Sequence, residues 1–127
     1  SMSTITVDAL KGKTTAKTVT VTVGATATQS LEQGLAKAWS KLTDDADTNS
    51  FNVSGTTDNG TAGNTTITFT NTMLNVDYAL ATCILEDFNM VCISTAQTTS
   101  NYTVQVENTS NSVGDANSSS IVMGDTA

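Results

Sequence analysis

The chain has 127 residues, enough for one domain or for a domain with a short stem. Only 38% of the residues are apolar, and charged residues make up 13%, about half of the usual share. The net charge of −7, with five basic residues, argues against nucleic-acid binding, which needs clustered lysine and arginine. It also argues against binding to anionic lipid, and no apolar run approaches the ~20 residues of a membrane span. Because a single copy can bury so little apolar surface, the composition favours burial shared between copies.

Two segments near the amino terminus alternate polar and apolar residues. Residues 4–10 and residues 18–23 both show the period of two that is typical of strands with one buried face. Residues 11–15 between them contain Lys11, Gly12 and Lys13 and predict a turn. We therefore expect a hairpin, which would be marginally stable alone because two strands bury too little.

The pattern changes at residues 30–42. Ser30 can cap a helix, and Gln33 three residues later completes a capping box. Apolar residues then recur at spacings of four, three and four, which is the pattern of a coiled-coil seam. This candidate trimer seam consists of Leu31, Leu35, Ala38 and Leu42. One amphipathic helix packed on its own domain explains the pattern equally well. Gly34 weakens the helix, which could stop near Ala38.

Residues 43–49 are polar and predict a linker, after which the chain is rich in strand patterns separated by turn signals. The expected fold is an all-β antiparallel sandwich with a short hairpin and a helix as its stem. The predicted parts are a stem (1–29), a helix with a linker (30–49) and a sandwich head (50–127). The expected head strands are 50–56, 65–70, 77–86, 89–96, 101–108 and 119–123.

The two cysteines permit a geometric test. If residues 77–86 and 89–96 form a hairpin around Asp87 and Phe88, then Cys83 faces Cys92 at a non-hydrogen-bonded pair, where side chains lie closest. A cross-strand disulfide is feasible there. The alternative, which we favour, is two buried thiols that act as small apolar side chains.

Nothing in the sequence specifies a catalytic or metal site. The chain has no histidine, which removes the commonest general base and the commonest metal ligand. Asp44, Asp45 and Asp47 could bind a hard cation, but a calcium loop needs more spaced oxygen ligands, so a solvated linker is favoured. We therefore expect neither an enzyme nor a bound cofactor or metal.

Binding residues are expected on loops. The candidate loops are 57–64, 86–89, 96–100 and 108–120. The chain has six aromatic residues (Trp39, Phe51, Phe69, Tyr78, Phe88 and Tyr102). Most of them alternate into strands and are expected in the core. Phe88 is the exception, because it falls at a predicted hairpin tip. The candidate receptor-binding residues are Phe88, Asp58, Asn59, Asn111 and Asn117.

Several motifs occur in an order that resembles one protein family. The run from Ser30 to Trp39, with Gly-Leu-Ala-Lys-Ala-Trp at 34–39, resembles a segment of tail-fibre-like proteins of marine bacteriophages. The motifs at 51–54, 57–61, 66–69 and 73–79, and the ending at 123–127, are similar to the same family in the same order. Residues 40–49 are more acidic than in the family, and the tract after Val104 departs from it.

The resemblance implies a distal tail-fibre domain on the virion, made in the host cytoplasm. It implies a homotrimer that joins the rest of the fibre and binds a glycan or protein receptor on the host-cell surface. The pattern of short strands also resembles, loosely, the six-stranded sandwich of H-type lectins, which are trimers too. A purely structural fibre tip or capsid-fibre domain is the third possibility.

Overall fold

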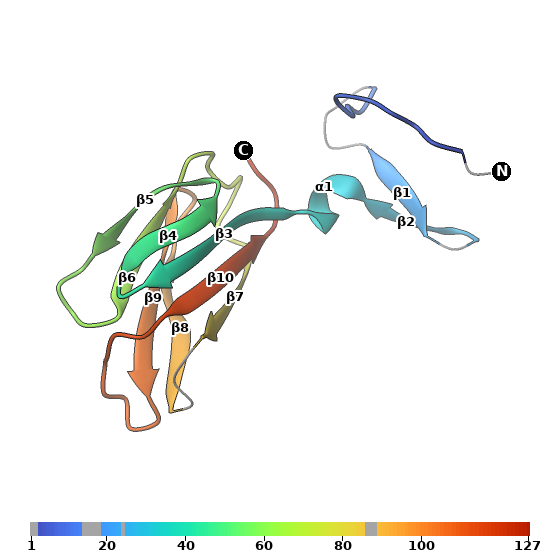
Figure 1. Ribbon diagram of the computed structural model, residues 1–127. Helices are drawn as coiled ribbons and strands as arrows, with labels where there is room; N and C mark the ends of the chain where they lie inside the picture. Colours follow the sequence, from blue (N-terminus) through green and yellow to red (C-terminus); the bar gives the residue numbers. More distant parts are fainter. Residues whose placement is uncertain (1–2, 14–18, 24, 86–88) are drawn as a thin grey trace. The chain divides into compact units, whose positions relative to one another are not determined.

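The computed structural model describes residues 3–13, 19–23, 25–85 and 89–127 (Figure 1). The chain divides between Leu35 and Ala36 into two compact units. The prediction of an all-β antiparallel fold is confirmed, because every pair of neighbouring strands in the three sheets is antiparallel. None of the described helices is long and apolar enough to cross a membrane.

The first unit contains a two-stranded hairpin and a single helical turn. Strand β1 (Thr20–Val23) pairs with β2 (Ala27–Ser30), and α1 (Leu31–Gly34) follows directly. The predicted hairpin between residues 4–10 and 18–23 is therefore wrong. The shorter connection between β1 and β2 closes at a lower entropy cost than the loop from residue 10 to residue 18. The described side chains of this unit are all exposed or half-buried.

The predicted helical seam is also wrong. The Ser30 hydroxyl does cap α1, accepting a hydrogen bond from the Gln33 N–H at 3.4 Å, but the helix ends at Gly34 and Leu35 is already extended. Ala38 and Leu42 lie on strand β3 (Ala36–Thr43) and are buried inside the second unit. Residues 36–42 fit both a helical and an alternating pattern, and burial of alternate side chains on a sheet decides between them.

The second unit is a sandwich of two four-stranded sheets. One sheet has the order β4-β3-β10-β7 and the other has the order β5-β6-β9-β8. Five of the six predicted head strands correspond closely to observed ones, whereas the predicted strand 50–56 spans the break between β4 and β5. The strands that follow β3 are β4 (Ala46–Phe51), β5 (Val53–Asp58), β6 (Asn64–Phe69), β7 (Ala79–Ile84), β8 (Met90–Gln97), β9 (Asn101–Asn108) and β10 (Ser118–Met123).

The predicted linker at 43–49 is wrong. Asp44 and Asp45 have φ of 45° and 63° and form a tight two-residue turn between β3 and β4. Positive φ at both central residues is the type I′ pattern, and aspartate tolerates it better than most residues. The sandwich therefore begins at Ala36 and includes β3 and β4, so the predicted head boundary at residue 50 lies too late.

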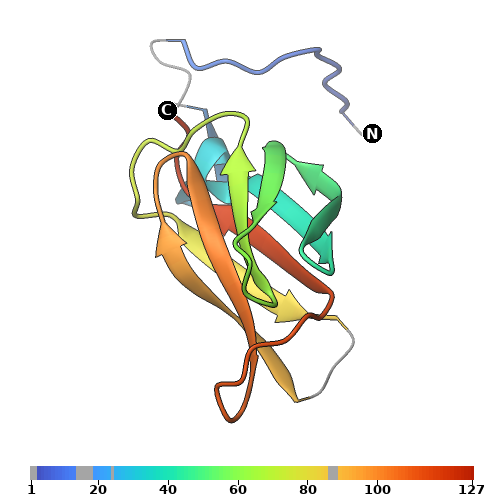
Figure 2. The ribbon, with the colours of Figure 1, turned by 90° about the vertical axis from the view of Figure 1, so that its left-hand side faces the viewer.

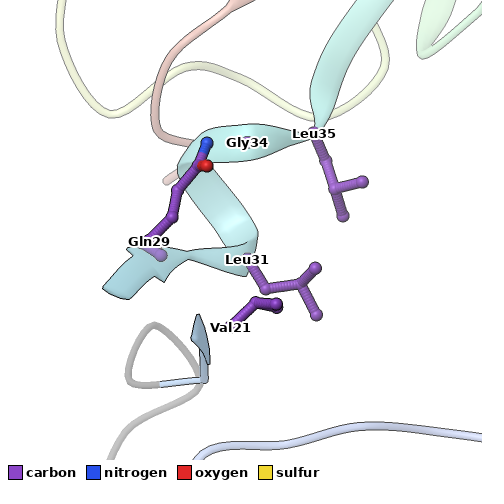
Figure 3. Close-up of a pocket in the computed structure, with 6 residues that line it drawn as sticks. Val21, Gln29, Leu31, Gly34 and Leu35 are labelled. Carbon is purple, nitrogen blue, oxygen red and sulfur yellow. The ribbon is translucent and has the colours of Figure 1, made fainter. Parts of the chain in front are cut away.

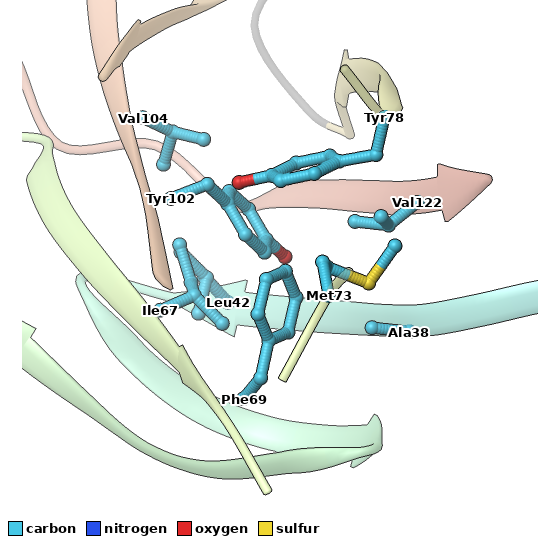
Figure 4. Packing of buried hydrophobic residues seen from close by; sticks show 9 residues of the cluster. All are labelled: Ala38, Leu42, Ile67, Phe69, Met73, Tyr78, Tyr102, Val104 and Val122. Atoms are coloured by element: carbon cyan, nitrogen blue, oxygen red, sulfur yellow. The ribbon is translucent and has the colours of Figure 1, made fainter. Parts of the chain in front are cut away.

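The core lies between the two sheets (Figure 4). Phe69 packs edge-on against Tyr78, with ring centroids 5.8 Å apart, and against Tyr102 at 5.5 Å. Such aromatic pairs add to the stabilisation that burial provides. The remaining members of the core are small or aliphatic apart from one methionine (Ala38, Leu42, Ile67, Met73, Val104 and Val122).

The core also contains a buried hydroxyl cluster. The Tyr102 hydroxyl lies 2.6 Å from Ser120 Oγ and 3.2 Å from Ser40 Oγ, and the two serine oxygens are 2.8 Å apart. Each buried hydroxyl thus has partners, as buried polar groups require. Burial raises the pKa of Tyr102 despite these hydrogen bonds. Among the described residues the core cluster has only nine buried members, and hydroxyls share its centre.

The predicted cysteine hairpin is wrong. Strands β7 and β8 belong to different sheets, so Cys83 lies beside Ser119 of β10 and Cys92 lies beside Val106 of β9. Both thiols are free. The expectation of two buried thiols is wrong for Cys83, which is exposed. Cys92 is half-buried, and burial raises the pKa of its thiol. The turn residues Asp87 and Phe88, on which the hairpin prediction depended, lie outside the described residues.

Candidate functional site

Three connections lie at the same end of the sandwich. They are the β3–β4 turn (43–46), the β5–β6 loop (59–63) and the β9–β10 loop (109–117), and we call this the distal end. Strand register places it opposite Ala36, because Ala36 pairs with Met123 at one end of β10 and Leu42 pairs with Ser118 at the other. In Figure 1 and Figure 2 the β9–β10 loop lies at the lower end, away from the carboxyl terminus.

Gly63 ties the three connections together. Its N–H donates to Asp115 Oδ1 at 2.7 Å and to Asp45 Oδ2 at 3.3 Å, and its carbonyl accepts from the Val106 N–H at 2.9 Å. Gly63 has φ of +68°, and a β-carbon there would lie 2.3 Å from the Gly114 carbonyl oxygen. Only glycine combines this conformation with so close an approach of backbone to backbone. The distal end is therefore a fixed arrangement of loops.

Asp45 also joins the β3–β4 turn to strand β6 by a hydrogen bond. Its Oδ1 accepts a hydrogen bond of 2.5 Å from the hydroxyl of Thr65, which is fully buried at the start of β6. Burial, together with the nearby charge of Asp115, raises the pKa of Asp45, although the hydrogen bonds from Thr65 and Gly63 act in the opposite direction. The native state therefore binds a proton on Asp45 more tightly than the unfolded chain does.

This shift predicts a pH dependence of stability. The favourable contribution of protonated Asp45 is complete below the unfolded-state value of 3.8 and is lost as pH rises through the raised native pKa. Replacing Asp45 with asparagine removes this loss, so the stability of Asp45→Asn relative to the native sequence should increase with pH above 3.8. Denaturant unfolding of both proteins at a series of pH values measures this difference. The control is Asp44→Asn at the exposed neighbouring residue, and a difference that does not change with pH would refute the prediction.

The β9–β10 loop is ordered by its own hydrogen bonds. The Asn108 side-chain oxygen accepts from the N–H groups of Ser110 and Ser112, at 2.8 and 3.0 Å. Asn111 has φ of 57° and donates its N–H to the Asn108 carbonyl. Residues 109–113 are exposed. This tip presents serine, threonine and asparagine side chains on a defined backbone.

The described candidate receptor-binding residues all occur at the distal end. Asp58 is exposed, and its Oδ1 accepts from the Gly60 N–H at 2.7 Å. The exposed Asn59 amide donates to Asn64 and Thr66. Asn111 is exposed, whereas Asn117 is half-buried and its carbonyl accepts from the Leu85 N–H. Phe88 and the loop at 86–89 lie outside the described residues, apart from Asn89. The predicted loop at 96–100 lies at the opposite end.

The two sheets have different outer faces, which sequence reasoning did not detect. The outer face of β5-β6-β9-β8 is polar along β6 and β9, where the Thr66 and Thr103 hydroxyls are 2.9 Å apart and the Asn64 amide lies 2.7 Å from Gln105 Oε1. On β8 it exposes two aliphatic residues, Val91 and Ile93. The outer face of β4-β3-β10-β7 carries Trp39, Phe51 and Ile121 instead. Trp39 and Phe51 were expected in the core, but they are 37% and 54% exposed. Trp39 alternates with the buried residues of β3, and Phe51 on β4 pairs with Trp39 and so lies on the same face.

A separate pocket lies within the first unit (Figure 3). It has a volume of about 210 Å³ and is lined by residues of β1, β2 and α1, including Val21 and Leu31, and by Leu35, which follows α1. Two residues of the predicted seam thus share one apolar recess. The recess is smaller than the roughly 300 Å³ at which small-molecule sites begin. We therefore do not assign it a ligand.

The described residues contain no cluster of three or more cysteine, aspartate or glutamate side chains that could hold a metal ion. No protein-family model, curated protein or solved structure matches the chain. The candidate site consequently depends on the distal loops and on the outer face of one sheet.

Proposed function

We propose that the chain is a non-enzymatic adhesin, the host-binding end of a bacteriophage tail fibre, and that it acts as a homotrimer. The observation that carries this proposal is the distal end, where Gly63, Asp45 and Asp115 fix three loops that expose hydroxyl and amide groups. This end lies opposite Ala36, through which the sandwich joins the preceding chain. A fibre that continues toward the amino terminus would leave it facing outward.

The chemistry of the distal loops suits many weak contacts. Hydroxyls and amides can each donate and accept hydrogen bonds, so they can bind glycan or protein surfaces without a deep pocket. Repetition over three copies can raise avidity by roughly two to four orders of magnitude without any new contact. Weak binding by each copy is therefore compatible with firm attachment of a particle.

A pair of matched double variants tests this proposal. Asn59→Ala with Asn111→Gly removes two distal amides, and glycine retains the positive φ at position 111. Thr70→Ala with Ser100→Ala changes two exposed residues at the opposite end. The full chain, labelled at its amino terminus, is applied to a panel of marine bacteria, with an unrelated trimeric protein as background. We expect the distal variant to bind about tenfold less than the native chain and the control to bind normally.

The outcomes also separate the alternatives. Equal binding by the two double variants, or no binding above background, would contradict the proposal and favour a purely structural tip. If cell binding depends on the distal residues, a glycan array with the same labelled chain identifies the receptor class. Binding to defined glycans would make the domain a lectin, and no binding to any glycan on the array would indicate a protein receptor.

A further inference from the structure

The outer face of the β4-β3-β10-β7 sheet carries an apolar row that runs across all four strands. Strand register places Phe51 beside Trp39, Trp39 beside Ile121, and Ile121 beside Ala81. Side chains at such paired positions lie about 5 Å apart, so the four residues form one continuous stripe. The described part of the chain contains nothing that covers this stripe, since Trp39, Phe51, Ile121 and Ala81 are all exposed.

The same face contains a recess beside the row. It has a volume of about 160 Å³ and lies between β7 and β10, next to Ala81, Cys83, Ser119 and Ile121. This volume is too small for a typical small-molecule ligand, which needs roughly 300 Å³ or more, but it suits a single side chain. Trp39 and Phe51 project from the same face. A second copy would therefore supply both the projecting aromatic side chain and the recess that receives it.

The distribution of charge also favours a second copy of the chain as the binding partner. Residues 36–127 include ten acidic residues and only two basic ones, Lys37 and Lys41, both on β3. Lys41 is exposed in the row next to the apolar one, beside Asn49 and Ser119. No described carboxylate projects from this face, because Asp47 on β4 pairs with the inward-facing Leu42. Through this face, which carries apolar groups and no described carboxylate, two copies of the acidic sandwich can therefore approach each other with the least charge repulsion.

We propose that this face is a subunit interface in which Trp39 and Phe51 of one copy pack into the recess beside Ile121 of the next copy. Repeated contacts of this kind form a closed ring when the rotation between copies closes. The inference rests on the proposed function only for the number of copies, three.

The area of the face can be compared with that of a typical interface. A face of four strands, each about six residues long, covers roughly 400 Å², about half of what each partner buries in a standard interface.

A matched pair of variants tests the interface in the full chain. Ile121 and Ile93 are the same residue type at similar exposure, 42% and 38%, but they project from opposite sheets. Ile121→Glu places a charge in the proposed interface, whereas Ile93→Glu places it on the opposite outer face. Sedimentation across a concentration series should show self-association of Ile121→Glu weakened on the order of a hundredfold. Ile93→Glu should associate like the native chain. Equal association of the two variants would overturn the proposal.

Cys83 provides an independent readout because it lines the recess. In the assembled native chain and in Ile93→Glu, a maleimide reagent should react slowly with Cys83, and in Ile121→Glu it should react at the rate of an exposed thiol. The half-buried Cys92 should stay slow in all folded variants, so fast labelling at both cysteines reveals unfolding. Should Ile121→Glu fail to fold, Ala81→Gln fills the recess without adding a charge and is expected to weaken association in the same direction. Normal association of a folded Ala81→Gln protein would then overturn the proposal.

These results are separable from the test of adhesion. If Ile121→Glu associates normally while the distal double variant loses cell binding, the interface assignment fails and the proposed function stands. If Ile121→Glu loses association while the distal variant binds cells normally, the proposed function fails and the interface stands.

Discussion

Alanine at position 63 is expected to destabilise the sandwich by about 2–4 kcal/mol and to loosen its distal end. The added β-carbon would lie 2.3 Å from the Gly114 carbonyl oxygen and 2.8 Å from the Val106 β-carbon. It would also occupy a residue with φ of +68°, where an L side chain is strained. Relief of the clash requires the β9–β10 loop to move away from the β5–β6 loop, which would break the Gly63 hydrogen bond to Asp115.

Gly60 provides the control for this substitution. It has φ of +75°, and a β-carbon there would meet nothing within 4 Å. Gly60→Ala should therefore lower the free energy of unfolding only by the cost of a positive φ at alanine, about 1 kcal/mol. Denaturant unfolding at a fixed protein concentration compares the two variants, since the proposed association would make apparent stability depend on concentration. Equal destabilisation by both substitutions would mean that the close approach at Gly63 contributes nothing.

Replacing Asn52 with alanine is expected to lower the free energy of unfolding by about 3 kcal/mol. Asn52 lies between β4 and β5, where the chain passes from one sheet to the other, and its φ is 56°. Its amide donates to the Lys37 carbonyl at 2.9 Å and to the Asn71 carbonyl at 3.0 Å, and its side-chain oxygen accepts from the Asn71 N–H at 2.7 Å. One side chain thereby joins β3, the β4–β5 corner and the segment after β6.

Two substitutions separate the causes at this corner. Asn52→Gly removes the three side-chain hydrogen bonds but accepts the positive φ, so it should be less destabilising than Asn52→Ala by about 1 kcal/mol. Thermal or denaturant unfolding of both variants gives the comparison. If alanine and glycine are equally well tolerated, with a loss below about 0.5 kcal/mol, the corner does not depend on Asn52.

The strands of the sandwich could largely be predicted from local patterns. The strand predicted at 101–108 matches β9, and the one predicted at 119–123 lacks only Ser118 of β10. Sheet partners could not be predicted in the same way, because β10 pairs with β3, which lies about 80 residues earlier in the chain. Nothing in the local sequence of Cys83 or Cys92 indicates that their strands belong to different sheets.

The residues of the distal end were found in part. Asp58, Asn59 and Asn111 carry the local signature of exposed turns, and they do lie at one end of the sandwich. The ties among Asp45, Gly63 and Asp115 have no local signal, because the three residues are distant in sequence and meet only when both sheets form. Trp39 was misassigned to the core because strand periodicity gives two faces without saying which one is buried.

The two outer faces differ in how well they suit the proposed assembly. One face pairs hydroxyl and amide groups along β6 and β9 and exposes Val91 and Ile93 on β8. The other exposes an aromatic row beside a recess, and its burial between copies would add apolar surface to the small core. The distal loops would then be repeated around a common axis, as multivalent attachment requires.

Sedimentation of the native full chain tests the central claim, self-association of a host-binding domain, most directly. The account predicts a mass of about three times 13.1 kDa at micromolar and higher concentrations. A compact, folded species of 13.1 kDa that persists across the concentration series would contradict it.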